Sequence, residues 1–195
     1  DLKDFTRALL NSRAYQLSSV ATPDNKTDVQ NFSHAAWKVL PAEVLLDNIC
    51  RATGVPESFN GWPEGYRAVQ VWDNRMPSYF FTIFGRPVRA TVCECERSDE
   101  PSIAQALHLL NSPEISGKIG HRHGLASQLA ASDRTPEAII EELYFTALSR
   151  PPQAEETALM LQAFQAFQAP GTDRFTATQD VLWAILNSRE FVFNR

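Results

Sequence analysis

Apolar residues recur at helical spacing along most of the chain, and helix-breaking residues separate the stretches. After Pro101, four apolar residues stand at i, i+3, i+4 and i+7: Ile103, Ala106, Leu107 and Leu110. This spacing places them on one face of a helix, which we expect to be buried against the core. Further helices are expected over residues 2–11, 33–53, 137–149, 154–168 and 173–187, where Pro, Gly, Ser, Thr or Asn residues mark the ends.

A Leu-Asn-Ser phrase closes three of these helices, at Asn11-Ser12, Asn111-Ser112 and Asn187-Ser188. Asn tolerates the left-handed conformation that often ends a helix. The Ser hydroxyl can accept a hydrogen bond from the first free N–H groups of the next helical turn. We therefore predict a helix break at each phrase, followed by a restart. The phrases are too unevenly spaced to indicate a tandem repeat.

The pattern is least regular between residues 67 and 97. Residues 68–72 and 88–92 each fit a short extended segment, which together would form a β-hairpin, whereas residues 78–84 fit one or two helical turns. Two short strands bury too little surface to be stable without helices beneath them. The expected fold class is therefore mainly α, an irregular orthogonal helical domain, with one short β-hairpin around residues 67–97 left open.

The composition fits a packed globular domain, because 44% of the 195 residues are hydrophobic and 21% are charged. We expect residues 1–195 to form a single helical domain, with a C-terminal helical subunit over residues 136–195 as the alternative. The chain starts inside an amphipathic helical pattern formed by Leu2, Phe5 and Leu9. This start is expected for a fragment of a larger protein.

The charge distribution excludes several classes of partner. The net charge is −5 and no run of Lys or Arg exceeds two residues, so we expect no nucleic-acid binding. The most apolar windows are interrupted by acidic residues such as Glu141 and Glu142, so we expect no membrane span. The sequence contains no nucleophile elbow and no phosphate-binding glycine loop, and we expect no cofactor.

Cys93 and Cys95 are the residues with the most reactive side chains. With His121 and His123 they would form a four-ligand nitrogen and sulfur set of the kind that zinc accepts. The alternatives are half-buried thiols, a local disulfide, or a disulfide from Cys50 to one of the two. Cys-x-Cys lacks the usual ligand spacing, so we predict that no metal is bound.

Charged residues are dense around these cysteines. In an extended segment, Glu94 and Glu96 would lie on one face, where two carboxylates could serve as acid and base. The alternative is an ion-pair network that the glutamates form with Arg86 and Arg89. We also count Arg86, Arg89 and Arg97 as candidate binding residues.

An aromatic loop provides a different candidate site. Trp62 and Tyr66 lie in a segment rich in Gly and Pro, and Trp72 follows closely. Exposed aromatic rings beside Asn and Glu are typical of surfaces that bind carbohydrate or peptide, because rings supply contact area at low entropic cost. The alternative is that these rings pack the loop onto the core.

Three phrases connect the chain with a known family: Phe-Gly-Arg-Pro at 84–87, Cys-x-Cys-x-Arg at 93–97 and Gln-Ala-Leu-His-Leu-Leu-Asn at 105–111. With them, nearly the whole chain resembles the planctomycete-type domain of unknown function at the C-terminal end of large proteins that often carry c-type cytochrome modules. The resemblance implies an extracytoplasmic module, periplasmic or at the cell surface, whose partners are other domains of the parent protein, among them a c-type cytochrome module. The haem-attachment signature Cys-x-x-Cys-His does not occur in this chain.

The sequence therefore favours a binding or scaffolding module that is not itself an enzyme. The rival interpretation is a small hydrolase or a redox or metal site built on Glu94, Glu96, Cys93 and Cys95. His108 lies in an apolar helix and is the remaining candidate for proton transfer, although a buried histidine bonded to a backbone carbonyl is the favoured interpretation.

Overall fold

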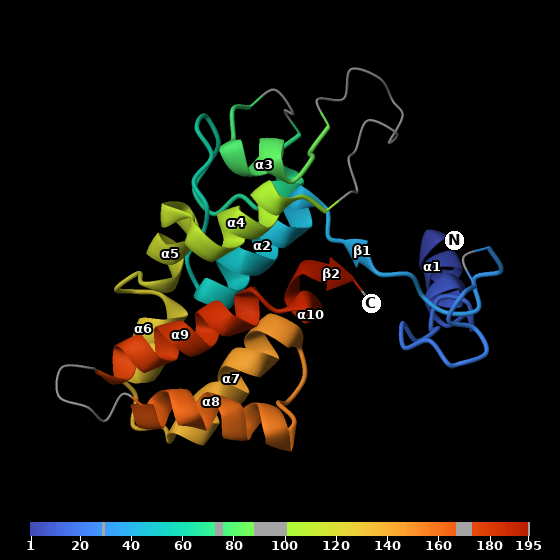
Figure 1. The fold of residues 1–195 in the computed structure, drawn as a ribbon. Helices are drawn as coiled ribbons and strands as arrows, with labels where there is room; N and C mark the ends of the chain where they lie inside the picture. The colour runs from blue at the N-terminus through green and yellow to red at the C-terminus, as the bar shows by residue number, and fades with distance from the viewer. Residues whose placement is uncertain (29, 73–75, 88–100, 167–172, 195) are drawn as a thin grey trace.

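The computed structural model describes residues 1–28, 30–72, 76–87, 101–166 and 173–194. The described chain is mainly α-helical, as the sequence predicts (Figure 1). Its longer helices are α1 (Leu2–Leu10), α2 (Ala42–Thr53), α4 (Ile103–Asn111), α7 (Pro136–Leu148), α8 (Ala154–Ala166) and α9 (Arg174–Leu186). The shorter ones are the 3-10 helix η1 (Ala68–Gln70), α3 (Tyr79–Ile83), α5 (Pro113–Ile119), α6 (Leu125–Ala130) and α10 (Arg189–Val192).

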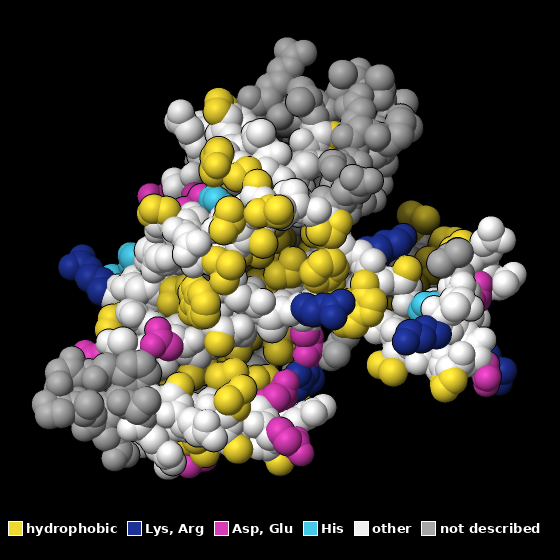
Figure 2. All heavy atoms as spheres, viewed as in Figure 1, with side chains coloured by type: hydrophobic (Ala, Val, Ile, Leu, Met, Phe, Trp, Pro, Cys, Tyr) yellow, Lys and Arg dark blue, Asp and Glu magenta, His cyan; other side chains and the backbone are white. Residues whose placement is uncertain are grey.

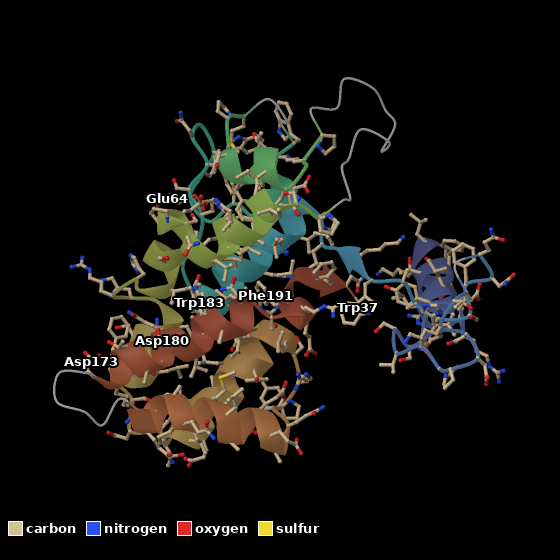
Figure 3. The ribbon with its side chains drawn as sticks, viewed as in Figure 1. Trp37, Glu64, Asp173, Asp180, Trp183 and Phe191 are labelled. Atoms are coloured by element: carbon tan, nitrogen blue, oxygen red, sulfur yellow. The ribbon has the colours of Figure 1, made fainter. Side chains whose placement is uncertain are left out.

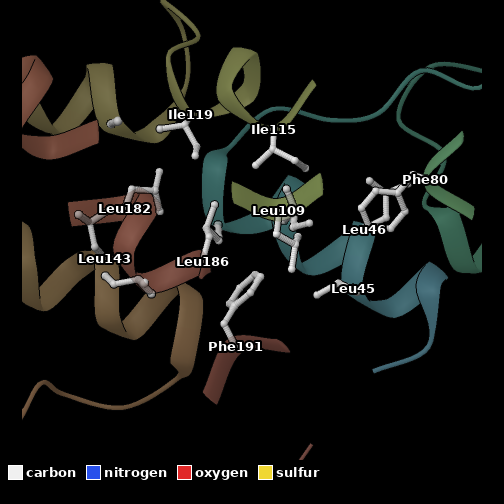
Figure 4. Close-up of a cluster of buried hydrophobic side chains, with 14 of the residues drawn as sticks. Leu45, Leu46, Phe80, Leu109, Ile115, Ile119, Leu143, Leu182, Leu186 and Phe191 are labelled. Atoms are coloured by element: carbon white, nitrogen blue, oxygen red, sulfur yellow. The ribbon is translucent and has the colours of Figure 1, made fainter. Parts of the chain in front are cut away.

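Helix α2 is at the centre of the hydrophobic core. It packs against α3, α5, α6, α7 and α9, and Leu45, Leu46 and Ile49 on its inner face are fully buried (Figure 4). The helix ends at Gly54, which has the left-handed conformation with φ of +69°. A Cβ atom there would also lie 3.2 Å from the backbone nitrogen of Leu125, so both the conformation and the space favour glycine.

Helices α7, α8 and α9 pack together below α2 in the view of Figure 1. The turn between α7 and α8 is held by Arg150, whose guanidinium donates hydrogen bonds of 2.6–2.8 Å to the carboxylates of Glu156 on α8 and Glu190 on α10. These two carboxylates raise the pKa of Arg150 above its ordinary value. Ser149, with φ of +58°, reverses the chain just before this arginine.

A two-stranded antiparallel sheet joins distant parts of the described chain. Strand β1 (Lys38–Val39) pairs with β2 (Phe193–Asn194), in the register Lys38 to Asn194 and Val39 to Phe193. The strands are therefore not in the 67–97 segment. Residues 68–70 form η1 instead of an extended segment, and residues 88–92 lie outside the described residues.

All three predicted helix breaks are confirmed, but the role expected of Asn is wrong. Asn11 and Asn187 follow α1 and α9 with φ of −88° and −91°, and each side-chain amide donates a hydrogen bond to a carbonyl four residues earlier. Ser112 and Ser188 cap α5 and α10 by accepting from backbone N–H groups, as predicted. After Ser12 the chain forms only turns.

The prediction of which face of α4 is buried is also wrong. Ile103, Leu107 and Leu110 are 80%, 53% and 37% exposed. The helix buries Gln105, His108 and Leu109 instead. Gln105 explains this rotation, because its side chain closes the N-terminal capping box of α4 and its amide donates to the Ile83 carbonyl at 3.1 Å.

Candidate functional site

The three aromatic residues that the sequence singled out come together on the surface. The Trp62 ring lies 5.3 Å from that of Tyr66 and 5.6 Å from that of Trp72, measured between centroids. Trp62 packs against the core, whereas Tyr66 is 36% exposed and Trp72 76% exposed. We call these three residues the aromatic cluster. Residues 55–72, which carry it, are called the aromatic loop.

Lys118 of α5 fastens the start of the aromatic loop. Its ammonium group is 3.0 Å from a carboxylate oxygen of Glu57 and donates to the carbonyls of Val55 and Pro56 at 3.4 and 3.2 Å. The Lys118 side chain is only 9% exposed. A buried ammonium is tolerated because three acceptors replace its water shell. The buried cation therefore fixes the loop at the point where it leaves α2.

Asp47 of α2 fastens the other end. Its carboxylate accepts hydrogen bonds from the backbone N–H groups of Ala68 at 2.6 Å and Val69 at 3.4 Å, and from the Arg67 guanidinium at 3.2 Å. These N–H groups belong to the first turn of η1, where helical partners are lacking. A negative charge at this position also interacts favourably with the turn.

Two further contacts with the core hold the aromatic loop, one at Phe59 and one at Val71. Phe59 is buried and stacks on Phe81 of α3, with centroids 6.1 Å apart. Arg86 donates to the carbonyl of Val71, pairs with Glu43 at 3.3 Å, and lies 4.4 Å over the Phe81 ring. The Arg86 side chain is only 4% exposed, so this residue, expected to bind a ligand, lies within the packed interior.

A cavity of about 480 Å³ lies between α2 and the aromatic loop. Tyr66 lines this cavity and also belongs to the aromatic cluster, so the two features are continuous. The rest of the lining is mixed and includes the polar and charged side chains of Asn48, Arg51 and Arg67. Cys50 lines the cavity as a free, half-buried thiol, and burial raises its pKa. A raised pKa keeps this thiol protonated and weakly nucleophilic.

His108 is placed beside a carboxylate. Its Nε2 atom is 3.8 Å from a carboxylate oxygen of Glu114, and the rings of Tyr79, Phe80 and Phe84 lie within 6.1 Å of the imidazole. Burial lowers the pKa of His108. Burial first, and then the charge of Glu57, raises the pKa of Glu114. Both shifts are in the direction of the neutral form, and His108 packs among three aromatic rings.

The remaining predicted residues are not brought together by the described structure. His121 and His123 are exposed after α5, with ring centroids 5.9 Å apart. Within the described ranges, no three His, Cys, Asp or Glu side chains form a group that could hold a metal ion. Six candidates lie outside the described residues and stay predictions: Arg89, Cys93, Glu94, Cys95, Glu96 and Arg97.

The sequence did not single out the groups that fasten the loop. Asp47 lies within the helix expected over residues 33–53, and no local pattern marks it as an anchor. Lys118 is a lone lysine in a short helix, and Glu57 is one acidic residue among many. Their pairing depends on α5 crossing the start of the loop, which no local pattern specifies.

The comparisons with known proteins extend this description. None of the helices in the described ranges has the length and apolar character that crossing a bilayer requires. Neither a curated protein nor a solved structure matches the chain. Residues 1–164 match the sequence profile of the family described as PSD1, a protein of unknown function (DUF1553), and the chain therefore belongs to that family.

Proposed function

We propose that this chain is a non-catalytic binding module and that the aromatic cluster, together with the adjoining cavity, is its ligand-binding surface. The observation that carries the proposal is the combination of an exposed Trp72 with a loop that is fastened at both ends. Lys118 and Asp47 hold the ends, and Phe59 holds the middle. A loop fixed in this way presents its rings without a large loss of entropy on binding.

The ligand class that we propose is carbohydrate. A sugar ring has an apolar C–H face, which stacks on aromatic rings, and a rim of hydroxyl groups, which need hydrogen-bonding partners. The aromatic cluster offers the rings, and the cavity beside Tyr66 offers Asn48, Arg51 and Arg67. Glu64, at the outer side of the loop in Figure 3, adds a carboxylate acceptor close to Tyr66 in the sequence.

We further propose that residues 1–195 form one domain of a larger extracytoplasmic protein associated with c-type cytochrome modules. This part rests on the resemblance of the sequence to planctomycete-type domains. Helices α7 and α9 bury Leu143, Leu182 and Leu186 in the same core as α2, which supports one domain over a separate unit at residues 136–195. The parent protein's other domains would then be the partners of this module.

The ligand proposal is tested with the 195-residue chain and a panel of soluble polysaccharides and oligosaccharides. Binding is measured by isothermal titration calorimetry and by tryptophan fluorescence. Replacing Trp72 by Ala should weaken binding at least about tenfold, as expected for a central aromatic contact. Tyr66→Ala should weaken it as well, because Tyr66 borders both the cluster and the cavity.

The matched control is Tyr15→Ala, which removes an aromatic ring that is 62% exposed near α1 and outside the aromatic loop. Its affinity should equal that of the wild type. Equal losses in Tyr15→Ala and Trp72→Ala would contradict the assigned surface. A wild-type chain that binds none of the panel would contradict the carbohydrate class.

A further inference from the structure

An apolar stripe on α4 is left open to solvent. Ile103, Leu107 and Leu110 stand at i, i+4 and i+7 on the outward face of α4, and all three are exposed. Figure 2 shows hydrophobic side chains gathered across the middle of this face. A helix surface of this kind usually packs against another helix. We call these three residues the α4 stripe.

A groove continues the α4 stripe toward the sheet. It measures about 200 Å³ and lies between α4 and the end of the chain, with mostly apolar lining that includes Ala106, Leu109, Val192 and Phe193. Val39 of β1 also lines it. Trp183 of α9 borders the stripe, because its indole N–H donates to the Leu110 carbonyl at 3.2 Å (Figure 3).

Helix α1 is a strongly amphipathic helix without a buried residue. Its apolar face consists of Leu2, Phe5 and Leu9 at i, i+3 and i+7, which are 83%, 66% and 49% exposed. In Figure 1, α1 stands apart from the helices of the core. A nine-residue helix is marginally stable by itself, so its apolar face needs a surface to pack against.

We propose that the α4 stripe and its groove bind α1 of a second copy of this chain, so that two copies exchange their α1 helices. The two apolar faces have matching lengths and helical spacing, which allows the side chains of one helix to fit between those of the other. The connection from α1 returns to the core at β1, and Val39 of β1 lines the groove itself. We call α1 and its connection to β1 the arm. Because the arm starts beside the groove of its own copy, it can reach the same groove of a facing copy.

A second copy fits the observations because the exchange is symmetric. Each copy carries one arm and one stripe, so a two-fold dimer satisfies both faces at once. Electrostatic repulsion does not oppose the contact of α1 with a second copy, because the charges on α1 and its cap balance. Although the chain has a net charge of −5, α1 and its cap carry two acidic residues, Asp1 and Asp4, and two basic residues, Lys3 and Arg7.

The test measures the oligomeric state of the 195-residue chain by sedimentation equilibrium over a range of concentrations. The wild type should be a dimer. Phe5→Asp in the arm and Leu107→Asp in the stripe should each raise the dimer dissociation constant at least about tenfold, because a charge would be buried in an apolar contact. Leu159→Asp on α8 is the control, since Leu159 is 61% exposed and lies outside the stripe, and it should leave the dimer unchanged.

Mixing the two weakened variants distinguishes exchange between copies from docking within one chain. The Leu107→Asp variant keeps an intact arm, and the Phe5→Asp variant keeps an intact stripe. An equimolar mixture should therefore form a heterodimer with one intact contact and associate more strongly than either variant alone. A monomeric wild type, a dimer that persists in both variants, or a mixture that associates no better than its components would overturn the proposal. Far-UV circular dichroism serves to check that each variant is folded before its association is compared with that of the wild type.

Discussion

The aromatic loop and α1 differ in how they are fixed. The aromatic loop has little regular structure, yet buried groups hold it at residues 55–57, 59 and 67–71. Helix α1 has regular structure and a capping Asp1, yet none of its residues is buried. We therefore expect contacts with the core, and not regular hydrogen bonding alone, to decide which of the two segments keeps a fixed position.

The largest effect is expected from removing the buried ammonium group of Lys118. Replacing Lys118 by Met should destabilise the fold by about 3 kcal/mol or more, because the Glu57 carboxylate and two carbonyls lose their partner. The measurement is urea-induced unfolding followed by circular dichroism. Lys3→Met on α1 is the control and should change the free energy of unfolding by less than about 0.5 kcal/mol. Similar losses in both variants would contradict the anchoring role of Lys118.

A smaller effect is expected at the other end of the loop. Asp47→Ala leaves the N–H groups of Ala68 and Val69 without their acceptor and should cost about 1–3 kcal/mol. Hydrogen exchange of these amides should accelerate more than that of the core helices. The control is Asp4→Ala, which removes an exposed ion pair with Arg7 and should cost less than about 1 kcal/mol.

Titration of the buried His108 and of the partly exposed Glu114 should make stability depend on pH. Burial lowers the pKa of His108 below its ordinary value of 6.5, so the unfolded chain binds more protons in this window and stability rises with pH through it. Burial raises the pKa of Glu114 above 4.5, so the folded chain binds more protons there and stability falls with rising pH. One proton contributes at most about 1.4 kcal/mol per pH unit.

His108→Gln should therefore remove the rise in stability toward pH 6.5 and keep the fall due to Glu114. Urea unfolding at a series of pH values measures both. The control is His123→Gln, at an exposed position after α5, which should keep the wild-type profile. An unchanged profile in His108→Gln would mean that the imidazole is not held in its neutral form.

The smallest effect is expected in α1. Leu9→Ala should change the free energy of unfolding by less than about 0.5 kcal/mol when measured on the monomer, because Leu9 is 49% exposed and adds nothing to the core. The same substitution in α2, Leu45→Ala, should cost about 2–5 kcal/mol, because Leu45 is fully buried. A large loss at Leu9 would show that α1 packs against its own chain.

The sequence predicted those features that depend on local chemistry. The helix breaks at Asn11, Asn111 and Asn187 were predictable because capping involves residues a few positions apart. The aromatic cluster was predictable because Trp62 and Tyr66 share one short segment of Gly and Pro residues. The mainly helical class followed from periodicity in the same way.

The features that depend on distant contacts could not be predicted. The apolar spacing in α4 identifies a face but does not say whether the core lies against it, and Gln105 and His108 turn the other face inward. The pairing of Val39 with Phe193 joins residues that are far apart in the sequence, and strands of two residues leave no sequence signal. The anchoring roles of Lys118 and Asp47 could not be predicted either, because their contacts join segments that are distant in the sequence.

Native-state hydrogen exchange compares how firmly the aromatic loop and α1 are held, because it reports on both segments in one experiment. The informative loop amides are those of Trp62, which donates to the Phe59 carbonyl, and Ala68, which donates to Asp47. For α1 they are the amides of Phe5 and Asn11. At concentrations where the chain is monomeric, the loop amides should be strongly protected and the α1 amides should exchange almost as fast as in an unfolded chain. Protected α1 amides beside rapidly exchanging loop amides would show that α1, and not the aromatic loop, is held in place.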